Sequence, residues 1–168
     1  MHSNSTHFLE IIEQHQGIIT SLCYAYYTSP EDRKDVRQEI ILQLWKSFTT
    51  FRGESKVSTW LYRVSLNTIL SRRRKEKRHL NTTDTALLNA SFEYACDDGH
   101  ELLNYLLGQL KDVDKAILIL QLEGYKNHES AAILGLTTTN IGSRLHRIKS
   151  LLRKSLKLNL YGYKKAKK

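Results

Sequence analysis

Two groups of side chains in the sequence have the types and spacing needed to bind nucleic acid. The first lies on a helix predicted to begin at Thr138, and one face of it presents Asn140, Ser143, Arg144, Arg147 and Lys149. Side chains of these types hydrogen-bond to base edges or bind phosphates. The other face is apolar at spacings of four, three and four residues, through Ile141, Leu145, Ile148 and Leu152. We therefore expect this helix to pack by one face and to contact a polyanion by the other.

The residues before this helix predict a helix-turn-helix motif, with a first helix at 127–134 and a turn at 135–137. Ala131 is small where the two helices must cross closely, and Gly135 can adopt the backbone conformation that a tight turn requires. Ile141 is placed to anchor the second helix on the first. An ordinary helical hairpin with a hydrated basic face is the alternative interpretation.

The second group is the run Arg72–Arg78, in which six of seven residues are basic. A hydrated helix end is the default interpretation of a charge run. Six cations beside one anion repel one another, however, unless a polyanion binds to them. We therefore expect this run to bind phosphate groups.

The composition supports a polyanionic partner and disfavours an enzyme. The 168 residues have a formal net charge of +9, and only one proline and eight glycines punctuate the chain. Cys23 and Cys96 form no metal or redox pair, and neither a paired-histidine motif nor a glycine-rich phosphate loop is present. We therefore expect no metal ion and no cofactor. An acidic cluster within 31–39 would suit a metal-dependent nuclease, but its spacing fits a helix cap and a polar helix face better.

The sequence also predicts a cytoplasmic protein without membrane insertion. Its N-terminus lacks a basic segment followed by an apolar one. No apolar run approaches the ~20 residues of a membrane span. Two cysteines without a pairing pattern suit a reducing compartment.

Apolar periodicity predicts an all-α fold with two small helical domains joined by a flexible linker. The first domain covers residues 1–78. The linker at 79–98 is acidic and has no lysine or arginine. The second domain, 99–160, contains a helix that starts at Asp112 and the helix-turn-helix, and a basic tail follows at 161–168.

Within the first domain, one helical stripe is predicted over residues 8–26. Ser29 and Pro30 have the types expected at the start of the next helix. That helix is predicted to stop at Gly53, and its apolar side comprises Val36, Ile40, Leu44, Trp45 and Phe48. A third helix begins near 57–59 and continues into the basic run.

Three stretches of the first domain and one of the second resemble a single family. The first three are 35–45, which ends in Leu-Trp, then Phe-Arg-Gly at 51–53, and Ser-Thr-Trp-Leu at 58–61 with the residues up to Asn67. They are similar to the second conserved region of extracytoplasmic-function sigma factors, the small promoter-specificity subunits of bacterial RNA polymerase. The helix-turn-helix, ending in Ser-Arg-Leu-His-Arg at 143–147, resembles the fourth region of that family.

The resemblance implies partners and a role for each region. The partners are core RNA polymerase, through its clamp helices and flap, promoter DNA and an anti-sigma factor, with the protein monomeric in the holoenzyme. The surface expected to dock on the clamp helices comprises Asp35, Gln38, Glu39 and Gln43. Their alternative interpretation is the polar face of an amphipathic helix.

The resemblance also assigns DNA contacts. Those expected at the minus-ten element, which opens by capture of unstacked bases, are Lys56, Ser58, Thr59, Trp60, Arg63, Asn67, Arg72, Arg73 and Arg74. Trp60 has two interpretations, because its helical spacing with Val64 favours the core over a stacking platform. Those expected at the minus-thirty-five element are Thr139, Asn140, Ser143, Arg144, Arg147 and Lys149.

The first helix of the motif departs from the family pattern at one position. Many family members have isoleucine where this chain has Ser130, which reduces apolar burial in the first helix of the motif.

The rival interpretation of the chain is a transcription regulator that shares the helix-turn-helix and binds duplex DNA unaided. Such a regulator has no need of the Ser-Thr-Trp-Leu element or of the basic run.

Overall fold

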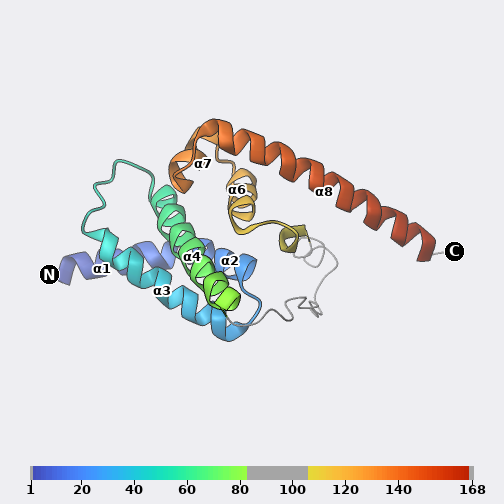
Figure 1. Ribbon diagram of the computed structural model, residues 1–168. Coiled ribbons are helices and arrows are strands. Elements are labelled where there is room, and N and C mark those ends of the chain that lie inside the picture. The colour runs from blue at the N-terminus through green and yellow to red at the C-terminus, as the bar shows by residue number, and fades with distance from the viewer. Residues whose placement is uncertain (1, 83–105, 167–168) are drawn as a thin grey trace. The chain divides into compact units, whose positions relative to one another are not determined.

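The computed structural model describes residues 2–82 and 106–166, and within these ranges it is all-α, as predicted (Figure 1). Contacts divide the chain into two compact units, Met1–Leu88 and Asn89–Lys168. From residue 83 onward the predicted linker at 79–98 lies outside the described residues. Each unit is therefore considered by itself.

The first unit consists of α1 (His2–Gln14), α2 (Gln16–Tyr26), α3 (Pro30–Phe48) and α4 (Val57–Thr82). The long helix α4 packs against both α2 and α3 (Figure 1). The largest fully buried side chains at this junction are aliphatic and come from all three helices: Ile19, Leu22, Val36, Ile40, Leu44, Leu61, Leu66 and Ile69. Burial of this apolar surface is the main force that holds α4 in place.

The stripe predicted over residues 8–26 is divided between two helices. Its apolar residues are buried as expected. At His15, however, the backbone has φ −115° and ψ 14°, and the Ile18 amide donates to the His15 carbonyl three residues back. This shorter bond interrupts the α-helical pattern and separates α1 from α2.

Helix α3 begins as the sequence predicts and ends earlier. The Ser29 hydroxyl accepts a hydrogen bond from the Asp32 amide, and Pro30 occupies the first turn, where its missing N–H costs nothing. The helix ends at Phe48, five residues before the predicted stop. Gly53 instead lies in the loop that leads to α4, with a positive φ of 72°.

The second unit contains α6 (Asp112–Leu122), α7 (Asn127–Leu134) and α8 (Thr138–Ala166), which pack against one another pairwise. The predicted helix-turn-helix is confirmed. Gly135 has φ 66° and ψ 36°, a left-handed conformation that side chains disfavour, and the Leu136 amide donates to the Ala131 carbonyl at 3.0 Å. Ile141 is fully buried, as expected for the anchor.

Helix α8 is longer than the sequence argument expected. It continues to Ala166 and so includes most of the basic tail that was placed at 161–168. Residues 151–160, which lead into this tail, are rich in leucine and lysine, which favour helix, and no proline in 151–166 would end one. The basic tail is thus an extension of the second helix of the motif.

Two glycines of the motif should respond to alanine in opposite ways. Gly135→Ala should lower the free energy of unfolding of the second unit by about 1–2 kcal/mol, because the added Cβ is disfavoured at positive φ. Gly142→Ala should raise it by up to about 1 kcal/mol, because Gly142 lies inside α8 and a Cβ there meets only an ordinary contact. A urea titration followed through the amide NMR signals of Ile133 and Ile141 measures both. If both substitutions changed the free energy of unfolding equally and in the same direction, the explanation from backbone conformation would be contradicted.

Candidate nucleic-acid interface

An exposed polar and basic stripe runs along α4 and the residue before it. Lys56, Arg63, Asn67 and Arg74 are all exposed, at successive spacings of seven, four and seven residues. These intervals are close to whole turns of an α-helix, so the four side chains lie on one face. The stripe is opposite the face that packs on α2 and α3. Of the remaining predicted minus-ten residues, Ser58 and Thr59 are half-buried at the start of the helix.

Trp60 lies in the core of the first unit. Its side chain is 8% exposed, and its ring stacks on Phe51 with centroids 4.9 Å apart and planes 28° apart. Phe48 lies beside it at 6.1 Å. The structure therefore favours the core interpretation of Trp60, in which it braces the loop between α3 and α4.

Arg72 and Arg73 lie on the other side of α4 from the stripe. Ser65 and Ile69 are fully buried. Arg72 and Glu76 follow on the same face of the helix, because the successive spacings from Ser65 to Glu76 are four, three and four residues. The first arginines of the basic run therefore continue the buried face, whereas Arg74 returns to the exposed one. Helical periodicity, applied inside the basic run, would have separated Arg72 and Arg73 from Arg74.

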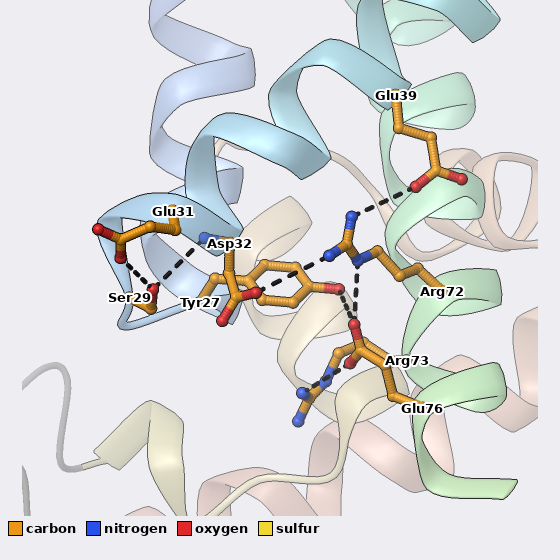
Figure 2. Close-up of polar contacts among 8 residues, drawn as sticks. All are labelled: Tyr27, Ser29, Glu31, Asp32, Glu39, Arg72, Arg73 and Glu76. Carbon is orange, nitrogen blue, oxygen red and sulfur yellow. Dashed lines mark hydrogen bonds and ion pairs between the residues drawn. The ribbon is translucent and has the colours of Figure 1, made fainter. Parts of the chain in front are cut away.

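Figure 2 shows the polar contacts of these arginines. The Arg72 Nε donates to Glu76 Oε1 at 3.0 Å, while its two terminal nitrogens lie 3.6 Å from Glu39 Oε2 and 3.8 Å from Asp32 Oδ1. Arg73 Nη1 donates to Glu76 Oε2 at 3.1 Å. The Tyr27 hydroxyl donates to Glu76 Oε1 at 3.4 Å, and its ring lies under both guanidinium groups. We name Tyr27, Asp32, Glu39, Arg72, Arg73 and Glu76 the arginine cluster.

Electrostatic interactions within the arginine cluster keep Arg72 charged and Tyr27 neutral. Burial raises the pKa of Tyr27, and the neighbouring Glu76 carboxylate raises it further. Burial alone would lower the pKa of Arg72, but its hydrogen bond to Glu76 and the nearby acidic groups outweigh this and raise it. Arg72 is therefore a fixed positive charge among carboxylates.

The surface predicted to dock on polymerase is a mixed polar and apolar face of α3. Asp35 and Gln38 are exposed, whereas Glu39 and Gln43 are half-buried. Leu42 is 50% exposed and Trp45 is 43% exposed. Trp45 was expected in the core, yet it only edges against Phe8, with ring centroids 5.0 Å apart. The residues that sequence reasoning missed here are Leu42 and Trp45, which follow Gln38 at spacings of four and three.

The N-terminal part of α8 presents most of the predicted minus-thirty-five residues to solvent. The exposed ones are Thr139, Asn140, Ser143, Arg147 and Lys149. The Thr137 hydroxyl accepts a hydrogen bond from the Asn140 amide at 3.2 Å and so caps this end of the helix. The outer face of the motif therefore has a defined start and a polar surface.

Arg144 differs from its neighbours because it is bound within the unit. Its Nη1 donates to Asp114 Oδ1 of α6 at 2.8 Å, and its Nε donates to the Asn140 side-chain oxygen at 2.7 Å. A charge-assisted bond of this length is among the stronger kinds. Arg144 therefore joins α8 to α6 and fixes the orientation of the Asn140 amide.

The described residues lack two features that other classes of protein require. In residues 2–82 and 106–166, three or more histidine, cysteine or acidic side chains nowhere gather as they would around a metal ion. In the same ranges, each helix is too short or too polar to cross a membrane. Of the acids within 31–39, Glu31 accepts a hydrogen bond from Ser29, and Asp32 and Glu39 pair with Arg72.

Comparisons with known proteins match both units of the chain. The family model for sigma-70 region 2 matches residues 11–79, and the model for sigma-70 region 4 matches residues 100–152. The chain belongs to the extracytoplasmic-function sigma factors of the sigma-70 family, which are promoter-specificity subunits of RNA polymerase.

Relatives and solved structures match over most of the chain. It is 28% identical to the RNA polymerase sigma factor SigV of Bacillus subtilis over 84% of this chain and 86% of that one. It is 26% identical to the ECF RNA polymerase sigma-E factor of Escherichia coli over 84% and 82%. The fold is similar to that of the sigma factor RpoE of Bartonella quintana in complex with the anti-sigma factor NepR, with a TM-score of 0.69, 19% identity and coverage of 94% and 98%.

Neutralising Asp114 should weaken promoter binding, although it makes the protein more positive. Asp114→Asn releases Arg144 and thereby Asn140, and we expect affinity for the minus-thirty-five element to fall about tenfold, the size of one good base contact. The measurement is binding of holoenzyme to a promoter that the wild type has selected from random-sequence DNA.

Glu123→Gln is the matched control for this experiment. Glu123 is exposed just after α6, so its neutralisation changes the same charge without touching Arg144. We expect the control to bind promoter DNA as well as the wild type or slightly better. If both variants bind alike, Asp114 does not orient the recognition face.

Proposed function

We propose that three surfaces of this sigma factor divide its work. The α3 face with Asp35, Gln38, Leu42 and Trp45 binds core RNA polymerase. The stripe along α4 contacts the minus-ten element, and the N-terminal part of α8 reads the minus-thirty-five element. The observation that carries this proposal is the separation of the first two surfaces on packed helices, one acidic and apolar, the other basic.

The composition of the α3 face supports a protein partner. Interface centres are rich in aromatic and aliphatic side chains that a polar rim surrounds. Leu42 and Trp45 supply the apolar part, while Asp35, Gln38, Glu39 and Gln43 supply the polar part. The two acids also repel DNA, which keeps this face available for polymerase.

The α4 stripe supports capture of a single strand. Lys56, Arg63 and Arg74 provide cations along one line, and Asn67 provides an amide that can donate to and accept from a base. Trp60 contributes indirectly, because its stack on Phe51 fixes the loop from which the stripe begins. Arg74 and the exposed residues after it hold phosphates.

The same reasoning extends to two further properties. The relatives with similar folds are recorded with anti-sigma partners, RpoE with NepR and CnrH with the cytosolic domain of CnrY, and an anti-sigma factor is proposed for this chain as well. Because RNA polymerase works in the cytoplasm, the proposal places the protein there. The chain acts as a regulatory subunit, and polymerase supplies the catalysis.

Removing one acid and one leucine from the α3 face should weaken polymerase binding at least about tenfold, since truncation of interface centres costs more than ~1 kcal/mol each. The variant is Asp35→Ala with Leu42→Ala, at two positions that are exposed and hence tolerant in the free protein. Titration of fluorescently labelled sigma factor with core RNA polymerase gives the affinity.

Glu13→Ala with Leu9→Ala is the matched control. It likewise removes one acid and one leucine from exposed positions, here of α1, where Leu9 is 58% exposed. We expect the control to bind core polymerase like the wild type. An equal loss in both variants would place the docking surface elsewhere on the first unit.

A further inference from the structure

We propose that Arg72 is a positioning residue that fastens the polymerase-docking helix α3 to the DNA-binding helix α4, and that it does not contact promoter phosphates. The proposal rests on the function proposed above, because it connects the two surfaces assigned there. It separates Arg72 from Arg74, two residues later in the same basic run.

The contacts of Arg72 cross between helices at two levels of α3. Asp32 lies in the first turn of α3 and Glu39 lies two turns later, and the guanidinium group of Arg72 reaches both from α4. Its third contact, with Glu76, lies one turn along α4 itself. A planar guanidinium can bind three carboxylates in fixed directions, which a flexible ammonium group does less well. Arg72 therefore defines how α3 and α4 lie relative to each other at this end of the unit.

The surroundings of Arg72 also make it a poor phosphate ligand. Its side chain is 24% exposed, and three carboxylates would repel an approaching phosphate. The Tyr27 ring, which is buried, lies 5.5 Å from the guanidinium carbon and blocks another side. A phosphate would have to displace these acids before it bound Arg72. Arg74 lies exposed on the opposite face, and among residues 2–82 and 106–166 no carboxylate pairs with it.

Glu39 connects the arginine cluster to polymerase docking. It belongs to the predicted docking surface, and its carboxylate is the one that pairs with Arg72 Nη1. The geometry of the docking surface and that of the α4 stripe therefore depend on a shared contact. Without Arg72, polymerase still binds α3, but α4 no longer presents its stripe at a fixed angle to the promoter.

The test compares the same substitutions at Arg72 and Arg74 in holoenzyme on the wild-type-selected promoter. Opening is measured by permanganate reactivity of minus-ten thymines, and binding is measured over a range of salt concentrations. Affinity falls as salt rises, and a lost phosphate contact lowers the magnitude of the slope of log affinity against log salt, the salt slope, by about 0.9. We expect Arg74→Gln to show that change and Arg74→Lys to restore the slope.

For Arg72 we expect a different pattern. Both Arg72→Gln and Arg72→Lys should reduce open complexes about tenfold and leave the salt slope unchanged. Arg72→Lys should fail like Arg72→Gln because lysine keeps the charge but lacks the planar guanidinium group. Adding Arg72→Gln to Glu76→Gln should cause little further loss, since both substitutions break the same cluster. A lower slope in Arg72→Gln that lysine restores would make Arg72 a phosphate contact and overturn the proposal, as would normal opening by both Arg72 variants.

Two measurements separate this proposal from simple unfolding and from failure of the proposed function. Trp45 and Trp60 both lie in the first unit, so tryptophan fluorescence verifies that each variant is folded at the assay temperature. Urea unfolding of the free protein, without polymerase, tests the pair Arg72→Gln and Glu39→Gln. If Arg72 joins the helices, the double variant loses less stability than the sum of the single ones, whether or not the wild type opens a promoter. Additive losses would overturn the proposal.

Discussion

The packing of α4 against α2 and α3 is the interaction on which the functional surfaces of the first unit depend. One face of this 26-residue helix is held by Leu61, Leu66 and Ile69, and the opposite face, in line with Lys56 just before the helix, is left for Arg63, Asn67 and Arg74. A helix that buries one side over many turns fixes the direction of every side chain on the other. The arginine cluster continues this control beyond the last buried aliphatic residues, into a segment that would otherwise be a mutually repelling charge run.

The second unit achieves the same result with other means. Gly135 sets the turn, Ile141 anchors α8, and the Asp114–Arg144 pair joins α8 to α6. In both units an arginine of a helix predicted to contact DNA pairs with a carboxylate of a neighbouring helix. Each ion pair is partly shielded from solvent, where charge-assisted bonds are stronger than on an open surface. A small domain with a limited core gains specific geometry from such pairs.

Most of the fold follows from local signals in the sequence. The Ser29-Pro30 cap and Gly135 are strong because each solves a backbone problem that few residue types can solve. The interruption at His15 has no comparable signal, so two helices were predicted as one. For the candidate site, counting the charges in 72–78 did not show which of them lie on the buried side of the helix. Trp45 was predicted to be buried on the ground of its apolar type alone. Ser130 is another feature that the sequence only suggested. It is fully buried, and among the described residues its hydroxyl has no hydrogen-bond partner.

The most direct test of the account is whether promoter recognition by this chain requires polymerase. The purified protein, core RNA polymerase alone, and the two together are each incubated with random-sequence DNA, and bound fragments are sequenced after size-exclusion chromatography. The account predicts a stable protein–polymerase complex that enriches two sequence elements, with opening at the downstream one, while neither component alone enriches either. Enrichment of a duplex site by the chain alone, without a complex with polymerase, would contradict the account and favour a conventional regulator.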